Sequence, residues 1–153
     1  MDAIFEDVVD AFTSRRQVGV CLVASTLLHD LLRKAGHKPV IRKGFQVLLG
    51  PKLYHFHVWV EVGDTKLDPA DEITRRVSGV DLKLLGGSTL TTDEPTEGFR
   101  RHDGAQDNKD VVDAERLLEL YSKKPHQYWQ QTPKWVQLKR KLLSKRHTTK
   151  DDD

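Results

Sequence analysis

Apolar residues near the start of the chain recur with helical spacing in two segments. Residues 2–13 place apolar side chains on one side of a helical wheel, with acidic residues at the other positions. Residues 20–35 repeat the period and end at Gly36, a residue type that commonly terminates helices. The pattern predicts an amphipathic helix followed by a buried one. The first stripe comprises Ile4, Phe5, Val8, Val9 and Phe12, and the second comprises Val20, Ala24, Leu27, Leu28, Leu31 and Ala35.

After Pro39 the pattern changes to that of β-strands. Residues 40–49 are rich in apolar and aromatic types and run into a Gly50-Pro51 turn, so they predict the first strand of a hairpin. Residues 54–62 predict a second strand, and Pro69 ends a short third strand. Alternation along the second strand sends His55, His57, Trp59 and Glu61 to one face and Phe56, Val58, Val60 and Val62 to the other.

The second half of the chain predicts a loop and two further helices. Residues 86–108 are rich in Gly, Thr and charge, which is typical of a long loop or lid. We expect an α+β fold with a core over 1–85, this loop, a C-terminal helical extension of the same domain over 109–146, and a disordered tail over 147–153. The extension should bury Val111, Ala114, Leu117, Leu118 and Tyr121 in one helix and Trp135, Leu138 and Leu142 in a basic helix from about 134 to 145.

Length and composition narrow the class of protein. A chain of 153 residues, 37% of them hydrophobic, suits one globular domain with one core. It has no apolar run of about 18 residues that could cross a membrane, and its acidic start lacks the order of a signal peptide. We therefore expect a soluble, cytoplasmic protein with no membrane partner.

Basic residues are concentrated at the C-terminal end. Residues 134–153 hold seven of the 25 Lys and Arg residues but three of the 23 Asp and Glu residues. A basic tail of this kind is more often a solvated helix face, but residues 128–146, where aromatic residues are interleaved with Lys and Arg, could bind an acidic partner or a nucleic acid. An acidic partner at this helix is therefore one prediction, and steep salt dependence of binding would support it.

The single cysteine is the first candidate for chemistry. Because Cys21 is the only cysteine, the chain can form neither an internal disulfide nor a zinc site with two thiolates. The remaining roles for Cys21 are packing in the core and nucleophilic catalysis. It falls in the first turn of the predicted second helix, where the helix dipole favours a thiolate. His57 in mid-strand could exchange a proton with this thiol, and Asp68 at the end of the next strand could orient the imidazole.

The order of these three residues resembles the transglutaminase-like (papain-like) superfamily. The resemblance lies in the helix-borne Cys21, in the HVWVEV segment that begins at His57, and in the LDP segment that contains Asp68. It covers about residues 15–75. The resemblance implies a nucleophile helix packed on a small antiparallel sheet, with Cys21 as nucleophile, His57 as general base and acid, and Asp68 as its orienter.

A narrower resemblance connects residues 21–45 with leader peptidases that mature lasso peptides. That family commonly has an Arg shortly after its cysteine, which this chain lacks, and this chain adds about 70 residues beyond the triad region. The resemblances imply a peptide or protein amide as substrate and hydrolysis or acyl transfer through a thioester. They imply no cofactor. An inactive binding module with the same fold is the alternative.

Other residues could share or replace these roles. His55 lies on the same strand face as His57 and could act as the base, but the Trp two positions on favours His57. Trp59 is expected to pack beside the site and Glu61 to be solvated. Gln17 could donate to an oxyanion, with the backbone N–H of Cys21 as the alternative donor. A metal site from His55, His57 and Asp68 fits by residue type, but we predict none because a thiol accompanies them.

Overall fold

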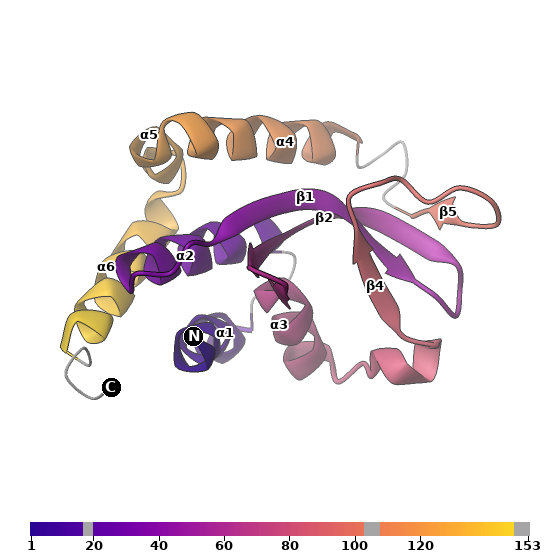
Figure 1. Cartoon of the computed structure of the whole chain (residues 1–153), viewed down its shortest axis with the longest axis horizontal. Helices are drawn as coiled ribbons and strands as arrows, with labels where there is room; N and C mark the ends of the chain where they lie inside the picture. The colour runs from indigo at the N-terminus through magenta and orange to yellow at the C-terminus, as the bar shows by residue number, and fades with distance from the viewer. Residues whose placement is uncertain (17–19, 103–107, 149–153) are drawn as a thin grey trace.

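The computed structural model describes residues 1–16, 20–102 and 108–148, and it combines helices with an antiparallel sheet (Figure 1). In chain order the elements are α1 (Asp2–Ser14), α2 (Cys21–Lys34), β1 (Val40–Leu48), β2 (Leu53–Val62), β3 (Thr65–Leu67), α3 (Pro69–Ser78), the 3-10 helix η1 (Leu82–Leu85), β4 (Ser88–Thr91), β5 (Arg100–Arg101), α4 (Asn108–Lys123), α5 (Pro125–Gln130) and α6 (Pro133–Thr148).

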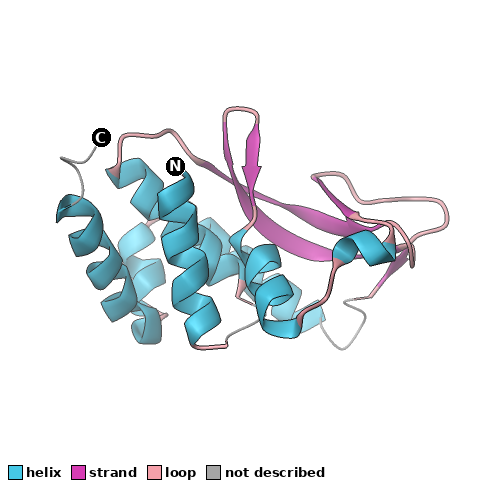
Figure 2. Ribbon diagram, turned by 90° about the horizontal axis from the view of Figure 1, so that it is seen from below, coloured by secondary structure: helices cyan, strands magenta, loops and turns pink. Residues whose placement is uncertain are grey.

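The sheet is built on the β1–β2 hairpin. Its strand order is β3-β2-β1-β4 with antiparallel pairing, and β5 joins the start of β2 in parallel. Gly44 lies directly opposite His57 in this register. A Cβ atom at Gly44 would lie 2.3 Å from the Thr91 carbonyl oxygen and 2.9 Å from the Trp59 ring, so only glycine fits there. Most of the helices lie toward the end that carries both chain termini, and the sheet extends away from them (Figure 2).

Helix α2 forms the centre of the hydrophobic core. Half of its residues are buried, and they pack against apolar side chains from α1, β2, α3 and the C-terminal helices. Two of the buried residues are polar, and both are satisfied: Ser25 donates to the Val58 carbonyl oxygen at 3.1 Å, and the Thr26 hydroxyl lies 3.1 Å from the Tyr128 hydroxyl. A buried hydroxyl without a partner would cost stability, so these bonds fix how α2 lies against its neighbours.

The C-terminal helices attach to α2 through one partly buried carboxylate. Asp30 accepts hydrogen bonds from the Tyr121 hydroxyl and from Trp129 Nε1, the latter at 2.9 Å, and it pairs with Lys139 Nζ at 2.7 Å. Burial would raise the pKa of Asp30, but its bonds to His29, Lys139 and Tyr121 outweigh burial and hold it below the ordinary value. One side chain of α2 therefore binds α4, α5 and α6.

Helix α6 is also pinned to α1. Trp135 stacks at a tilt on Phe12 with ring centroids 4.7 Å apart, and Lys145 pairs with Asp7 at 3.0 Å. Lys139 and Lys145 are thus engaged within the molecule, although the sequence suggested a basic face for a partner. The acidic partner at this helix stays a prediction.

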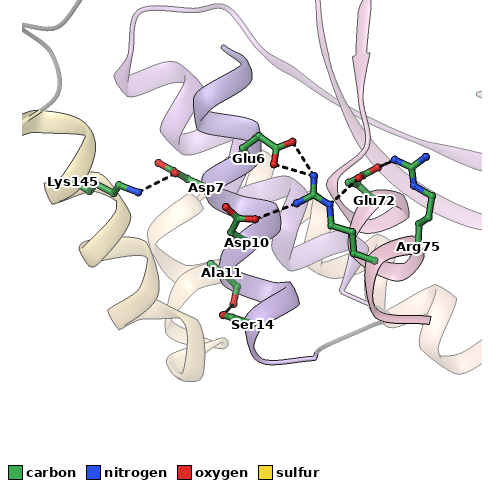
Figure 3. A network of polar contacts seen from close by, with 9 residues as sticks. Glu6, Asp7, Asp10, Ala11, Ser14, Glu72, Arg75 and Lys145 are labelled. Atoms are coloured by element: carbon green, nitrogen blue, oxygen red, sulfur yellow. Dashed lines mark hydrogen bonds and ion pairs between the residues drawn. The ribbon is translucent and has the colours of Figure 1, made fainter. Parts of the chain in front are cut away.

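Exposed ion pairs link α1 to α3. Arg76 of α3 bonds both Glu6 and Asp10 of α1, and Glu72 of α3 bonds both Arg75 and Arg76 (Figure 3). Exposed pairs of this kind each contribute only about 0–1 kcal/mol. The apolar contact of Ile73 and Val77 with the core therefore carries most of the docking of α3.

Several expected elements are confirmed and others need correction. The helices over 2–13 and 20–35, the hairpin and the third strand are present. Residues 86–102, expected as part of a loop, contain β4 and β5, and α6 continues to Thr148, into the expected disordered tail. Of the positions expected to be buried in α4, Leu118 and Tyr121 are buried, whereas Val111, Ala114 and Leu117 are half-buried. No described helix is long and apolar enough to span a bilayer.

Helix α6 is expected to be required for stability. A chain ending at Thr132 loses Trp135, Leu138 and Leu142, each less than 10% exposed, and losing one such side chain costs about 2–5 kcal/mol. A chain ending after Arg146 keeps all three and should melt close to the full chain. Thermal melts followed by circular dichroism measure both truncations. Equal melting temperatures for the two would show that α6 contributes nothing to the core.

Candidate active site

Cys21 is the first residue of α2, and its side chain is half-buried. It follows Val20, whose backbone is not helical, so the free backbone N–H groups of the first turn begin at the cysteine itself. These N–H groups and the helix dipole favour negative charge at this position. The local structure therefore places a thiol where a thiolate, or an oxyanion beside it, is stabilised.

His57 lies in the middle of β2 and is 5% exposed. Its Nε2 atom is 2.7 Å from Asp68 Oδ2, and Cys21 is near enough for its side chain to influence the pKa of the ring. Burial disfavours the charged imidazole, but the hydrogen bonds and negative charges of Asp68 and Cys21 outweigh it and raise the pKa of His57 to about 10. The ring is therefore positively charged at neutral pH.

Asp68 lies between β3 and α3 and serves both the fold and the candidate site. Its Oδ1 atom accepts the backbone N–H of Asp71 at 3.1 Å, which caps α3, while Oδ2 faces His57. Pro69 occupies the first helical position and restricts Asp68 to an extended backbone, observed at φ −119° and ψ 86°. The carboxylate is thus oriented by the start of α3 before it meets the imidazole.

Cys21, His57 and Asp68 are brought together from three separate elements. The Ser25 bond to the Val58 carbonyl connects the second turn of α2 to the residue after His57. Because Ser25 lies one helical turn after Cys21, this bond holds the thiol close to the imidazole. His57 bonds Asp68 and lies near enough to Cys21 for the two side chains to interact, as the roles of nucleophile, base and orienter would require.

The other residues that the sequence pointed to have different places. The His55 ring lies 5.6 Å from the His57 ring and bonds His102 at 3.0 Å. Trp59 is 1% exposed and therefore packs inside the protein and does not line an open surface. Glu61, expected to be solvated, is half-buried with its side chain 20% exposed, and it accepts hydrogen bonds from Trp59 Nε1 and from Arg42, each at 3.1 Å. Gln17 lies outside the described residues.

Two residues near the site were missed by the sequence analysis. Gln46 of β1 is 6% exposed and donates from Nε2 to Asp71 Oδ1 at 2.9 Å. Asp71 follows Asp68 by three residues, and this spacing after an Asp-Pro helix start resembles a capping box, a signal that could have predicted α3. Nothing in the alternation of β1 marks Gln46 as buried, because its partner lies in another element.

Among the described residues no group of three His, Cys, Asp or Glu side chains is placed to hold a metal ion. Comparison of the chain with protein-family models, curated proteins and solved structures gives no match. The function must therefore be argued from this geometry.

The protonation of His57 is directly measurable. With ¹⁵N-labelled histidine, both ring nitrogens of His57 should carry protons through pH 8 and titrate near pH 10, because Asp68 and Cys21 stabilise the charged ring. Asp68→Asn should lower the midpoint, since a neutral amide stabilises imidazolium less. The His57→Gln variant identifies the resonances. A wild-type midpoint near 6.5, the ordinary histidine value, would show that the three residues do not interact as described.

Proposed function

We propose that this protein is a cysteine-dependent hydrolase or acyltransferase that cleaves a peptide or protein amide through a thioester. The observation that carries the proposal is the buried His57, which bonds Asp68 at 2.7 Å and whose pKa is raised by both Asp68 and Cys21. A cysteine at a helix start beside an imidazole that a carboxylate orients is the arrangement that thiol catalysis requires. The proposed fold is transglutaminase-like, in keeping with the sequence resemblance.

The reaction would begin with the ion pair already formed. The Cys21 thiolate attacks the amide carbonyl carbon, and the oxygen of the tetrahedral intermediate lies near the free N–H groups at the start of α2. The His57 imidazolium then gives its proton to the departing amine, the C–N bond breaks, and a thioester remains on Cys21.

The second half of the reaction releases the acyl group. Neutral His57 takes a proton from water or from an amine, and that nucleophile attacks the thioester. Water yields a carboxylic acid, an amine yields a new amide, and Cys21 is regenerated in either case. Asp68 keeps the imidazole oriented in both halves.

Covalent capture of the lone cysteine tests the proposal without a known substrate. Iodoacetamide reacts with the thiolate, and an ordinary thiol with a pKa of about 8.5 is almost fully protonated at pH 6. If Cys21 is paired with the His57 imidazolium, iodoacetamide should label it much faster at pH 6 than it labels an ordinary thiol. His57→Ala should slow labelling by about 100-fold or more, the lower range for losing a proton-transfer group. Asp68→Asn should slow it by about tenfold, and Cys21→Ala should abolish it. Intact mass gives the rates.

Matched variants separate the triad from its surroundings. His55→Ala should label as fast as wild type, since His55 bonds His102 and the ring whose pKa Cys21 raises is that of His57. Circular dichroism should be unchanged in every variant. If His57→Ala labels at the wild-type rate across pH 5–9, Cys21 is an ordinary thiol. The protein is then a binding module and not an enzyme of this class.

A further inference from the structure

A chain of polar contacts joins buried and half-buried side chains and continues from the candidate triad to β1. It runs from His57 to Asp68, from Asp68 Oδ1 to the Asp71 backbone N–H at 3.1 Å, and from Asp71 Oδ1 to Gln46 Nε2 at 2.9 Å. Gln46 is one of four buried polar residues among the described part of the chain, with Ser25, Thr26 and His57. A buried amide in a strand interior lowers the stability of the fold unless it is hydrogen-bonded. Here Gln46 Nε2 donates one of its protons to Asp71, in the first turn of α3.

We propose that Gln46 and Asp71 are positioning residues for the proposed reaction: their bond anchors the first turn of α3 to the sheet and thereby holds Asp68 Oδ2 toward His57. The inference rests on the proposed function for its catalytic meaning, although the geometry stands without it. Asp71 supplies the backbone N–H that fixes Asp68 Oδ1, so a shift of Asp71 turns the Asp68 carboxylate. Gln46 fixes Asp71 from β1, the strand that carries Gly44 opposite His57.

The titration of His57 depends on the ionisable groups around its ring. Cys21 faces its ring from α2 and Asp68 from the start of α3, while His55 lies on β2 itself, 5.6 Å from the ring. Asp71 interacts electrostatically with both His57 and Asp68, and burial raises the pKa of Asp71 above the ordinary aspartate value. A change in Asp71 can therefore act through its bond or through its charge, and the variants must separate the two.

Two substitutions make that separation. Gln46→Met keeps the size and removes the donor, so the bond is lost while the Asp71 carboxylate stays. Asp71→Asn removes the charge, but its side-chain oxygen can still accept from Gln46. Positioning through the bond predicts that Gln46→Met lowers the His57 titration midpoint by about one pH unit, a tenfold change in the protonation equilibrium. Asp71→Asn should leave the midpoint within about 0.3 unit, well under that tenfold change.

The experiment measures the His57 ring by ¹⁵N NMR and the iodoacetamide rate by mass. Gln46→Met should also slow labelling about tenfold, in the range typical of losing a supporting hydrogen bond behind a functional ligand. Arg76→Gln is the control, because it loosens α3 from Glu6 and Asp10 without touching Asp71, and it should change neither reading. If Gln46→Met does not fold, Asp71→Ala removes the same bond, and comparison with Asp71→Asn, which removes the same charge but keeps the acceptor, should give the same two shifts.

Each outcome decides the proposal. Wild-type values for the midpoint and the rate in folded Gln46→Met or Asp71→Ala would overturn it, and equal shifts in Arg76→Gln would reduce Gln46 to a general structural role. A larger shift in Asp71→Asn than in Gln46→Met would overturn positioning in favour of charge. The midpoint does not depend on catalysis, so a lowered midpoint in a protein whose wild type shows no rapid labelling would uphold positioning and reject the proposed function.

Discussion

The enclosure of α2 is the constraint on which the rest of this structure depends. A helix buried on most sides must satisfy every polar group it carries inside the protein, because an unpaired buried group costs about 1–3 kcal/mol. Asp30 does so by binding side chains of α4, α5 and α6, and Ser25 does so by binding the backbone of β2. These bonds hold the middle of the helix, so the position of Cys21, one turn before Ser25, follows from the packing of the whole domain.

The candidate site therefore lies where the enclosure ends. The first turn of α2 is the part of the helix with free backbone N–H groups, and its side chains, Cys21 among them, are half-buried. His57 in β2 and Asp68 at the start of α3 complete the arrangement. Since Asp68 caps α3 with one oxygen and binds His57 with the other, folding of α3 and orientation of the imidazole are one event. A change that unwinds the start of α3 also removes the orienter.

Periodicity predicted the elements whose apolar face is long enough to show it. The stripes of α1 and α2 and the alternation in β2 belong to such elements, and the spacing of Cys21, His57 and Asp68 could be read from them. Helix α3 was missed because it buries few residues, chiefly Ile73 and Ala70, so its amphipathic stripe is too short to stand out. Strands β4 and β5 were missed because their pairing partners are distant in sequence. The roles of Gln46 and Asp30 were not predicted because their hydrogen-bond partners are also distant in sequence.

The charge state of His57 decides which step of the proposed reaction depends on the protein most. With the imidazole already protonated at neutral pH, attack by the thiolate requires no proton removal, and the first proton transfer is donation to the departing amine. A ring with a pKa of about 10 is a weak acid, however, and donation becomes favourable only as the thiolate charge beside it is lost to the new C–S bond. The loss of the Cys21 charge lowers the pKa of the ring at the moment the amine needs a proton. Asp68 limits this fall in the pKa of His57, because its carboxylate still stabilises the charged ring. The same bond that orients the imidazole therefore makes it a weaker acid. The start of α3 positions Asp68 and so determines how strong this bond is.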